Sequence, residues 1–479
     1  MRASVTLDET IAERFAAIVG PRYALRDGKE IEPYITDARS RYETTSPLVL
    51  RPGSVEEVSA ILKLATETKT PVVPQGGNTG LVGGGIPLVG QANAVMISLG
   101  RMNRIVDVDA ASNTMLVEAG AILETIQKAA DDADRLFPLS LGSQGSCQIG
   151  GNIGSNAGGT GVLAYGNTRD LVMGLEVVLP TGEVLNGLSR LRKDNTGYDL
   201  RNLFVGAEGT LGIVTKAVLK LFPKPAGTAV AYVGVKTPDN ALDLLNRAKG
   251  AAGSGLTGFE FISETAMDFT IRHAANPTQP PLADPHPWTI LIEVSSGRSE
   301  AEANEILESI LGDALESVVI DDAVVAQSLA QQKAFWQLRE DMSWAQKPEG
   351  ASIKHDISVP VGSVPAFIEK ADAAVLAIVP EARIVNFGHM GDGNLHYNIS
   401  QPVGWDPHDF FAHEDAIHNA IYKIVGTFEG SISAEHGIGQ MKRDKLAVIK
   451  DPVSLALMKR IKREIDPAGI MNPGKVLQT

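Results

Sequence analysis

The sequence predicts an α+β protein with two main domains, the first built around glycine-rich loops and the second around an antiparallel sheet backed by helices. The chain has 479 residues, which is more than one hydrophobic core normally accommodates. Its glycines concentrate in two tracts, at residues 74–87 and 141–166. Beyond residue 225, a βαββαβ pattern of the ferredoxin-like type occurs twice.

Composition and charge narrow the class of protein. The formal net charge of -14 has the wrong sign for a partner made of phosphates, so we expect no nucleic-acid binding. No stretch approaches the roughly 18 consecutive apolar residues of a membrane span. The single Cys147 excludes an internal disulfide or CxxC pair and fits a reducing compartment. Together with an N-terminus that lacks signal and transit patterns, this predicts cytoplasmic residence, with peripheral membrane association left open.

The first domain is placed at residues 46–225, after a polar lead-in at residues 1–45 that includes a helix. A second helix follows Ser54, because this residue is a good N-cap and apolar residues then recur every three or four positions. Short strands are expected in "PVVP" and on both sides of the Pro-Thr-Gly turn in "LVMGLEVVLPTGEVL". A long strand closed by prolines is expected at 209–225.

The second domain is placed at residues 226–430, and residues 431–479 form a C-terminal segment. Two ferredoxin-like halves are expected to join into one larger antiparallel sheet. The first half has expected strands at 229–237, 255–262, 288–296 and 315–322 and helices at 239–250 and 299–314. The second has an expected strand at 351–360, a hairpin at 384–400, a strand at 431–434 and helices at 363–378 and 406–428.

The glycine tracts favour a site for a phosphate-bearing ligand. Glycine lets backbone amides approach a ligand closely, and arrays of amides bind phosphate. Neither a G-x-G-x-x-G fingerprint nor a G-x-x-x-x-G-K-[ST] loop is present, so a nicotinamide Rossmann site or a P-loop is not supported. A plainer alternative stays open at this point, in which the glycines serve only the turns of a β-rich domain.

These tracts, with "DLVMGLEVVLPTGEVL" and "LFVGAEGTLGIVTK", resemble the FAD-binding domain of the vanillyl-alcohol oxidase superfamily. The resemblance implies a two-lobed FAD-binding domain, a substrate domain, and a C-terminal segment that returns to the flavin. All nine histidines lie at residue 273 or later, outside the glycine-rich domain, so noncovalent FAD is expected. The residues implied to contact FAD are Pro74, Gly76, Gly77, Asn78, Thr79, Gly80, Gly142, Ser143, Gly150, Gly151, Ile153, Asn156, Gly158, Gly159, Ile213 and Asn472.

A second group of candidate residues lies in "HMGDGNLHYN" and "AEHGIG". If the Asp-Gly pair turns a hairpin, His389 stands directly opposite His396, and two imidazoles can chelate one ion. Glu435 would add an oxygen ligand, and this set matches a catalytic zinc or similar divalent ion. The alternative is a hairpin with two solvated histidines. His413 and His418 are five residues apart and are expected on a surface helix.

These two segments, with "NPGKVL" near the C-terminus, resemble the FAD-dependent D-2-hydroxyacid dehydrogenases of that superfamily, which act on D-lactate or D-2-hydroxyglutarate. The resemblance implies that His389, His396 and Glu435 bind the metal and that His436 is the catalytic base. In the implied reaction, the metal lowers the pKa of the 2-hydroxyl, His436 takes the proton, and the hydride at C2 passes to FAD N5.

Two cations precede the metal hairpin. Arg339 in "LREDMSW" and Lys354 in "ASIKHDISVP" suit a substrate with two carboxylates, although Arg339 also fits an ion pair between helices. The segments resemble the D-2-hydroxyglutarate dehydrogenase group, which implies Arg339, Ser343, Lys354 and Asn398 as substrate-binding residues. Ser343 stands where that group has Thr, so D-malate, D-lactate or a broader specificity stays open.

The expected function is the oxidation of D-2-hydroxyglutarate to 2-oxoglutarate. Two alternatives from other classes are a metallohydrolase that uses the same histidines with water, and a catalytically silent flavin-binding subunit. The sequence has no iron–sulfur or haem spacing, so the electrons must pass to a separate partner. The resemblance suggests electron-transfer flavoprotein or a quinone as that partner, and a homodimer is retained as an assembly to test.

Overall fold

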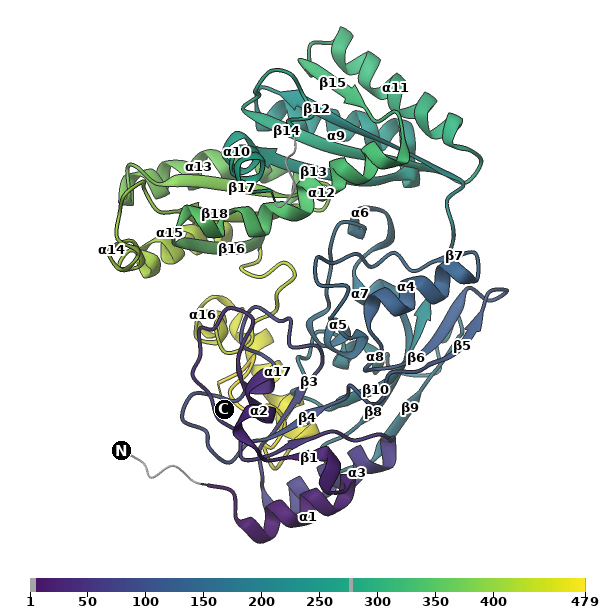
Figure 1. Ribbon diagram of the computed structural model, residues 1–479, viewed down its shortest axis with the longest axis vertical. Coiled ribbons are helices and arrows are strands. Elements are labelled where there is room, and N and C mark those ends of the chain that lie inside the picture. The colour runs from purple at the N-terminus through teal and green to yellow at the C-terminus, as the bar shows by residue number, and fades with distance from the viewer. Residues whose placement is uncertain (1–5, 275–278, 479) are drawn as a thin grey trace. The chain divides into compact units, whose positions relative to one another are not determined.

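The computed structural model describes residues 6–274 and 279–478, and the chain divides into two compact units (Figure 1). Unit 1 comprises Met1–Gly158, Gly166–Lys224 and Glu435–Thr479, and unit 2 comprises Gly159–Tyr165 and Pro225–Ala434. The sequence predicts four segments, with boundaries at residues 45, 225 and 430. This division into two units does not test those boundaries, which stay a prediction.

The smaller sheet of unit 1 has four strands in the order β1-β2-β4-β3, and β4 pairs in parallel with both neighbours. Helix α3 (Val55–Thr68) leads into β3, and its N-cap Ser54 accepts a hydrogen bond from the N–H of Glu57, which confirms the predicted cap. The strands are β1 (Ala24–Leu25), β2 (Val49–Leu50), β3 (Val72–Gln75) and β4 (Val95–Ser98). Helix α1 (Glu9–Val19) precedes β1, and α2 (Gly28–Ile35) lies between β1 and β2 in the chain.

The larger sheet of unit 1 has five antiparallel strands in the order β5-β6-β10-β8-β9. The expected strand-turn-strand around Pro-Thr-Gly is β8 with β9, and the expected long strand is β10. The strands are β5 (Ile105–Asp109), β6 (Thr114–Glu118), β8 (Val172–Val178), β9 (Val184–Gly187) and β10 (Ile213–Lys220), with a separate ribbon of β7 (Arg135–Leu136) and β11 (Phe222–Pro223). The remaining helices of the unit are α4 (Leu123–Asp132), α5 (Ile149–Ser155), α7 (Thr168–Leu171), α8 (Arg201–Phe204), α16 (Arg443–Ile449) and α17 (Pro452–Ile465).

The sheet of unit 2 has seven antiparallel strands in the order β15-β12-β14-β13-β17-β18-β16. This confirms the predicted sheet, in which the pairing of β13 with β17 joins the two halves. The strands are β12 (Gly227–Val235), β13 (Leu256–Ser263), β14 (Trp288–Ser296), β15 (Asp322–Val325), β16 (Ser352–Ser358), β17 (Arg383–His389) and β18 (Asn394–Ser400).

Three elements of unit 2 differ from the prediction. The strand expected at 315–322 is β15, which starts only at Asp322 because the preceding helix runs on to Glu316. The strand expected at 431–434 is reduced to one bridge between Ser431 and Ser358. The helix expected at 406–428 is divided into α14 (Pro407–Phe411) and α15 (Glu414–Thr427).

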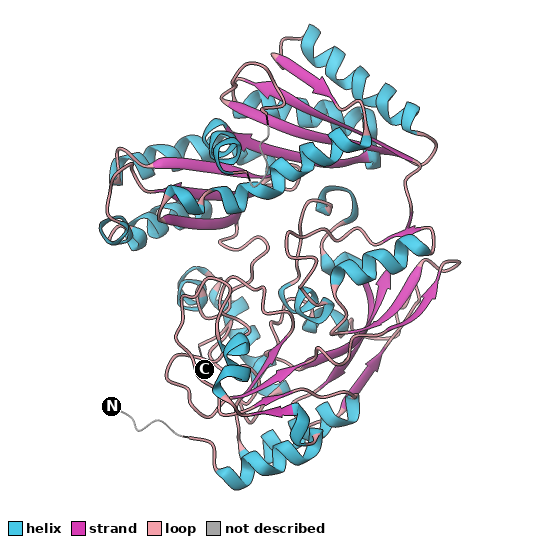
Figure 2. Ribbon diagram, viewed as in Figure 1, coloured by secondary structure: helices cyan, strands magenta, loops and turns pink. Residues whose placement is uncertain are grey.

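Helices cover both faces of the unit 2 sheet, as the cyan ribbons beside the magenta strands show (Figure 2). On one face, α9 (Pro238–Ala252), α11 (Glu300–Glu316), α13 (Val364–Ile378) and α15 enclose the larger hydrophobic cluster. On the other face, α10 (Glu264–His273) and α12 (Leu329–Ala345) enclose a smaller cluster that includes Tyr232, Phe335 and Phe387. This second face also carries the polar residues of the candidate site. The short α6 (Val162–Tyr165) completes the unit.

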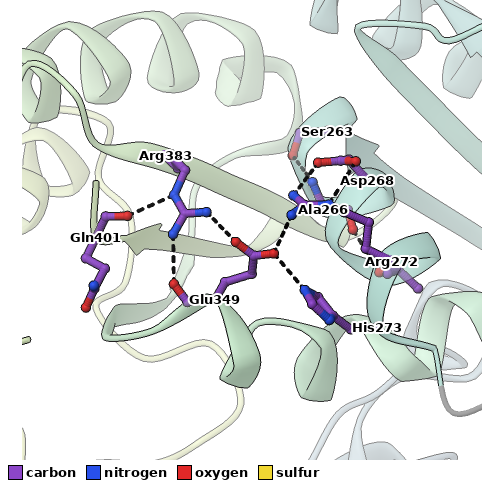
Figure 3. A network of polar contacts seen from close by, with 9 residues as sticks. Ser263, Ala266, Asp268, Arg272, His273, Glu349, Arg383 and Gln401 are labelled. Atoms are coloured by element: carbon purple, nitrogen blue, oxygen red, sulfur yellow. Dashed lines mark hydrogen bonds and ion pairs between the residues drawn. The ribbon is translucent and has the colours of Figure 1, made fainter. Parts of the chain in front are cut away.

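A half-buried carboxylate, that of Glu349, connects the start of β17 to α10 and to the turn after α12 (Figure 3). Glu349 forms ion pairs with Arg272 at 2.6 Å and with Arg383, and its Oε1 lies 2.7 Å from His273 Nε2. Burial would raise the pKa of Glu349, but His273 and the two arginines hold it below its ordinary value. Because Arg383 opens β17, this network anchors the strand that ends at His389.

Helices α11 and α12 have 17 residues each. Within residues 6–274 and 279–478, no helix is both long and apolar enough to cross a membrane.

Truncation of a core side chain of α11 tests the packing of unit 2. Leu307 is fully buried in the larger cluster, so Leu307→Ala should lower the free energy of unfolding by about 2–5 kcal/mol, through lost burial and a cavity. Leu315 lies on the same helix with 44% of its surface exposed, and the control Leu315→Ala should change it by no more than about 0.5 kcal/mol. Urea denaturation followed by circular dichroism measures both, and equal effects would contradict this packing.

Candidate functional site

Unit 1 contains a cavity whose walls are largely main chain. The walls come from the loop after β3, from α5 and the turn before it, from the loop before β10, and from His436 in the C-terminal segment. Besides His436, the lining includes Gly76, Gly77, Asn78, Thr79, Gly80, Val82, Gly83, Gly84, Gly85, Gln148, Gly150, Gly151, Asn152, Glu208, Gly209, Gly212 and Ile213.

The glycines of this cavity serve two purposes. A Cβ on Gly77 would lie 2.1 Å from the carbonyl oxygen of Ser146, so glycine is required where the two loops meet. By contrast, a Cβ on Gly80 or Gly151 would meet no described atom within 4 Å, and both residues line the cavity. The missing side chains keep the wall open to a ligand that approaches the main chain closely.

The cavity wall also holds buried acceptors that lack protein partners. Gln148 Oε1 and Asn152 Oδ1 are buried and make no hydrogen bond to any described residue. Native proteins normally satisfy such atoms, because a buried acceptor without a donor is costly. Two acceptors in a glycine-lined cavity fit FAD, whose ribityl hydroxyls and ring N–H are donors.

The predicted FAD contacts divide between this cavity and its surroundings. Those that line the cavity are Pro74, Gly76, Gly77, Asn78, Thr79, Gly80, Gly150, Gly151 and Ile213. Asn472 supports the wall, because its Nδ2 donates to the carbonyl oxygens of Gly84 and Glu208. The others do not line it: Gly142 and Ser143 lie in the loop before α5, Ile153 is buried within α5, Asn156 caps that helix, Gly158 packs against Glu435, and Gly159 belongs to unit 2.

His436 reaches the cavity wall because the segment after it is bound to a half-buried carboxylate, that of Glu208. Glu208 accepts hydrogen bonds from the N–H of Ile438 at 2.7 Å and from that of Gly439 at 2.8 Å. Gly437 has φ of 81°, and a Cβ there would lie 2.9 Å from Glu208 Oε1, so only glycine fits. Burial raises the pKa of Glu208. Local backbone geometry therefore places the predicted base beside the glycine loops.

In unit 2, the two histidines of the predicted metal site lie on β17 and β18, which are joined by a four-residue turn; His389 ends β17, and His396 is the third residue of β18. The predicted register is wrong, because His389 pairs with Asn394, and His396 pairs with Phe387. The centre of the turn lies one residue before the Asp-Gly pair, which shifts the pairing by two positions. An even shift preserves the face, so both histidines still point to the same side of the sheet as diagonal neighbours.

The two imidazoles lie close together beside a buried carboxylate. The ring centroids of His389 and His396 are 5.4 Å apart, with the rings at 81°. Asp356 on β16 is the direct cross-strand partner of His396, and its Oδ1 lies 3.9 Å from His396 Nδ1. Asn394 Nδ2 donates to the same Oδ1 at 3.1 Å. Nitrogen and oxygen donors of this kind are the ligands that zinc and related divalent ions use.

A second buried carboxylate lies next to His389. Glu260 on β13 has its Oε1 2.7 Å from His389 Nδ1 and its Oε2 2.6 Å from Arg339 Nε. Arg339 comes from α12, and its Cζ lies 4.9 Å from the ring centroid of Phe387. Burial alone would raise the pKa of Glu260, but His389 and Arg339 hold it below its ordinary value. Arg339 therefore has the ion-pair partner that the sequence left open, on a strand rather than a helix.

The remaining predicted substrate residues lie around these groups. Lys354 on β16 and Asn398 on β18 are cross-strand partners, two residues along from the pair of Asp356 and His396. Alternation along both strands puts the four side chains on one face. Ser343 is exposed on α12, one turn after the arginine of that helix.

Glu435, the third predicted metal ligand, opens the C-terminal segment of unit 1. Within that unit it packs against Gly158, where a Cβ would lie 2.6 Å from Glu435 Oε1. It follows directly on Ala434, the last residue of unit 2, whose N–H donates to the carbonyl oxygen of Asp356 at 3.4 Å. The predicted ligand set thus draws on both units, and its role in metal binding stays a prediction.

The helix expected around His413 and His418 is α15, which begins directly after His413, and His418 is not a solvated surface group. His418 Nδ1 lies 2.8 Å from His355 Nε2, and its side chain is only 19% exposed. Since His355 and Asp356 are adjacent on β16, this pair lies on the opposite face of the sheet from His396. It is separate from the candidate metal site.

Several residues of the site were not predicted from the sequence. Glu260 and Asp356 each carry a weak signal: the first is an acid inside the apolar strand "GFEFI", and the second is two residues from Lys354 on an alternating strand. Glu208 carries none, because the amides that it binds are some 230 positions away in the chain. Only the folded chain brings them together.

Two protein-family models match the chain. The model described as FAD binding domain matches residues 46–187, and that described as FAD linked oxidases, C-terminal domain, matches residues 224–476. The mitochondrial D-2-hydroxyglutarate dehydrogenase of Arabidopsis thaliana is 39% identical over 98% of this chain and 82% of its own. The D-2-hydroxyglutarate dehydrogenase of Xanthomonas citri pv. viticola is 38% identical over 94% of this chain and 93% of its own. A putative D-lactate dehydrogenase of Schizosaccharomyces pombe is 35% identical over 98% and 90%, respectively.

Solved structures share the fold. A p-cresol methylhydroxylase matches with a TM-score of 0.78 at 18% identity, over 98% of this chain and 96% of its own. An alkyldihydroxyacetonephosphate synthase matches with a TM-score of 0.74 at 18% identity, over 98% and 86%. At this identity the likeness concerns the fold alone. It confirms the predicted α+β fold of the vanillyl-alcohol oxidase type.

A substitution in the cavity wall tests FAD binding without lowering the stability of unit 1. Gly151 lies in α5, where alanine favours the helix by roughly 0.5–1 kcal/mol, and its Cβ would project into open space. Gly151→Ala should therefore leave the flavin-free protein at least as stable as the parent, but weaken FAD binding by about tenfold or more, ~1.4 kcal/mol. Fluorescence titration of flavin-free protein with FAD measures the affinity.

The matched control is Gly312→Ala in α11, where an added Cβ would also meet no described atom within 4 Å. It shares the helical effect of alanine and should leave FAD affinity unchanged. An unchanged affinity in Gly151→Ala as well would mean that FAD does not approach α5 at this point.

Proposed function

The chain belongs to the FAD-linked oxidases of the D-2-hydroxyglutarate dehydrogenase family, and we propose from this membership and from its site that it oxidises D-2-hydroxyglutarate to 2-oxoglutarate. It is an FAD-dependent D-2-hydroxyacid dehydrogenase. The metallohydrolase alternative, in which the glycines serve only turns, disagrees with the match of residues 46–187 to an FAD-binding domain.

One observation carries the choice of substrate class. A single face of the unit 2 sheet presents His389 and His396 for a metal, with Arg339 beside the first histidine and Lys354 two residues from the cross-strand partner of the second. A 2-hydroxyacid with a second carboxylate has one hydroxyl for a metal and two anions for two cations. D-2-hydroxyglutarate has these groups.

The proposed cofactors are noncovalent FAD and a zinc or similar divalent ion. The glycine-lined cavity with its unpartnered acceptors fits FAD, and the imidazoles and carboxylates of unit 2 fit a divalent ion. When bound, FAD takes up a hydride equivalent from the substrate and the metal makes the 2-hydroxyl more acidic. His389, His396 and Glu435 are the proposed metal ligands, and Asp356 is a further carboxylate beside His396.

The side chains of the chain bind the substrate and move one proton. His436 is the proposed base, which takes the proton of the 2-hydroxyl onto its imidazole. Arg339 and Lys354 are proposed to bind the carboxylates, and Asn398 and Ser343 to donate hydrogen bonds to the substrate. These roles require no covalent intermediate on a side chain.

The proposed electron acceptor is electron-transfer flavoprotein or a quinone, because the sequence has no iron–sulfur or haem spacing for onward transfer. A cytoplasmic location is proposed from the lone Cys147, which fits a reducing compartment. The plant relative is named mitochondrial, and cell fractionation distinguishes the two locations. A homodimer is proposed as the assembly, and its mass in solution tests this.

Anaerobic reduction of the bound flavin tests the function. D-2-hydroxyglutarate, its L enantiomer, D-malate and D-lactate are added separately to the purified protein, and the flavin absorbance band is followed. D-2-hydroxyglutarate should bleach the band fastest, EDTA should abolish the reaction, and zinc should restore it. His436→Gln should retain flavin and slow the bleaching by roughly 10²–10⁴-fold, the usual contribution of a general base.

Each part of the proposal has its own contrary result. Bleaching by D-lactate alone would contradict a substrate with two carboxylates. Bleaching that is insensitive to EDTA would contradict the metal, and no bleaching by any of the four acids would favour a silent flavin-binding subunit.

A substitution of Lys354 tests whether this residue distinguishes substrates with two carboxylates from substrates with one. Arg339 is already paired with Glu260, which is an argument for a monocarboxylate such as D-lactate unless Lys354 binds a second anion. Lys354→Met should raise KM for D-2-hydroxyglutarate by about tenfold or more, since a hydrogen bond to a charged group contributes about 1.5–3 kcal/mol, and leave KM for D-lactate unchanged. The control is Lys333→Met, an exposed lysine of α12. An equal rise for both acids would show that Lys354 binds the carboxylate they share.

A further inference from the structure

Glu260 is the most deeply buried charged group near the candidate site, and the sequence assigned it no role. It lies on β13, the strand that joins the two halves of the unit 2 sheet, and it is 1% exposed. Its neighbours Phe259 and Phe261 point into the larger hydrophobic cluster, so Glu260 points to the opposite face, which α12 covers. A charge buried in this way persists only when it is paired.

The two oxygens of Glu260 have different partners. Oε1 lies 2.7 Å from His389 Nδ1, and Oε2 lies 2.6 Å from Arg339 Nε. The spacing to His389 is set by the sheet, because Glu260 and His389 are direct cross-strand partners on β13 and β17. The spacing to Arg339 is set by the packing of α12 on the same face. One carboxylate therefore contacts a proposed metal ligand and a proposed substrate-binding group.

The contact with His389 determines which ring nitrogen carries the proton. A carboxylate accepts hydrogen bonds, so Nδ1 must be the N–H donor. In the neutral ring the lone pair is then on Nε2, and a metal binds a nitrogen with a lone pair. A metal-binding histidine that donates its other N–H to a carboxylate is held in tautomer and orientation, and is a more basic ligand.

The contact with Arg339 orients a buried guanidinium. Arg339 is 6% exposed, Nε donates to Glu260, and Nη2 is buried with no hydrogen-bond partner among the described residues. Buried donors in native proteins normally have a hydrogen-bond acceptor. A carboxylate is the acceptor that matches the planar fork of arginine.

We propose that Glu260 is a positioning residue that holds His389 and Arg339 at a fixed separation, and thereby couples metal binding to the recognition of the carboxylate that all 2-hydroxyacid substrates share. The inference rests on the proposed function. It adds that the position of this shared carboxylate relative to the metal is set by a residue that itself touches neither metal nor substrate. A purely structural ion pair would stabilise the fold without affecting metal affinity.

Metal affinity is the first readout, and it is independent of activity. The full-length flavoprotein is stripped of metal and titrated with Zn²⁺ in competition with a chromophoric chelator. Glu260→Gln keeps the shape of the side chain but presents an amide to His389, and it should weaken Zn²⁺ binding by about 10–100-fold, as is typical when such a partner is lost. Co²⁺ in place of Zn²⁺ adds a spectroscopic signature, and its absorption bands should shift in the variant.

The second readout is the substrate. Arg339→Met should raise KM for D-2-hydroxyglutarate and for D-lactate alike, since both acids carry the carboxylate that Arg339 binds, and it should leave Zn²⁺ affinity unchanged because Glu260 still holds His389. Glu260→Gln should show both defects together. This pattern would demonstrate the coupling, because it assigns one defect to the arginine alone and two to the carboxylate.

The matched control is Glu293→Gln. Glu293 lies on β14, the neighbouring strand, on the same face, and accepts hydrogen bonds from Trp336 Nε1 at 2.8 Å and Thr257 Oγ1 at 2.7 Å. It contacts neither His389 nor Arg339 in any hydrogen bond that the structure describes. Its substitution by Gln should change neither Zn²⁺ affinity nor KM.

A further variant controls for a loss of stability. Glu260→Gln leaves Arg339 as a buried cation without its anion, which can destabilise the fold. The double variant Glu260→Gln/Arg339→Met removes that cation and should recover thermal stability, while Zn²⁺ affinity stays weak. Equal Zn²⁺ affinity of the parent and Glu260→Gln would overturn the inference alone. Absence of Zn²⁺ binding in the parent would overturn the metal site of the proposed function, and the role of Glu260 with it.

Discussion

The pairing of Glu260 with His389 and Arg339 is the interaction on which the arrangement of the unit 2 site depends. The carboxylate lies on β13 and the imidazole on β17, so the pair spans the seam between the two ferredoxin-like halves. A slip of one residue at this seam would turn Glu260 into the larger hydrophobic cluster and leave both partners without an anion. The buried charges therefore specify the register of the sheet as well as the chemistry of its polar face.

The two units present different groups on their candidate binding surfaces. Unit 1 presents main chain, because glycines at the meeting of loops remove the side chains that would fill the cavity. Unit 2 presents side chains, because alternation along four neighbouring strands gathers imidazoles, carboxylates and a lysine on one face. A rigid sheet suits the second task, since cross-strand neighbours are held at fixed spacing, while loops suit the first, since their amides can turn toward a ligand.

Hydrophobic periodicity, together with turn and capping residues, predicted most helices and strands. The predictions were wrong where the tertiary structure overrides local preference. The strand expected at 315–322 starts only at Asp322, after α11 has continued to Glu316, and the strand expected at 431–434 is a single bridge. The hairpin register was missed by two positions because Asp-Gly is a good turn in isolation, whereas here the turn has four residues and ends before Asn394. The histidines kept their common face only because the error was even.

The sequence by itself determined the kind of protein through its resemblance to a known family, because the glycine tracts, the paired histidines and the Glu-His segment are local motifs that can be compared without a structure. It also determined the faces of the strands, because alternation is a property of the chain. Only the tertiary structure decided the partners of the buried charges. Glu208 meets amides some 230 residues later, and Glu260 meets His389 129 residues later. Contacts between segments so distant are set by packing and strand order, and no local pattern encodes them.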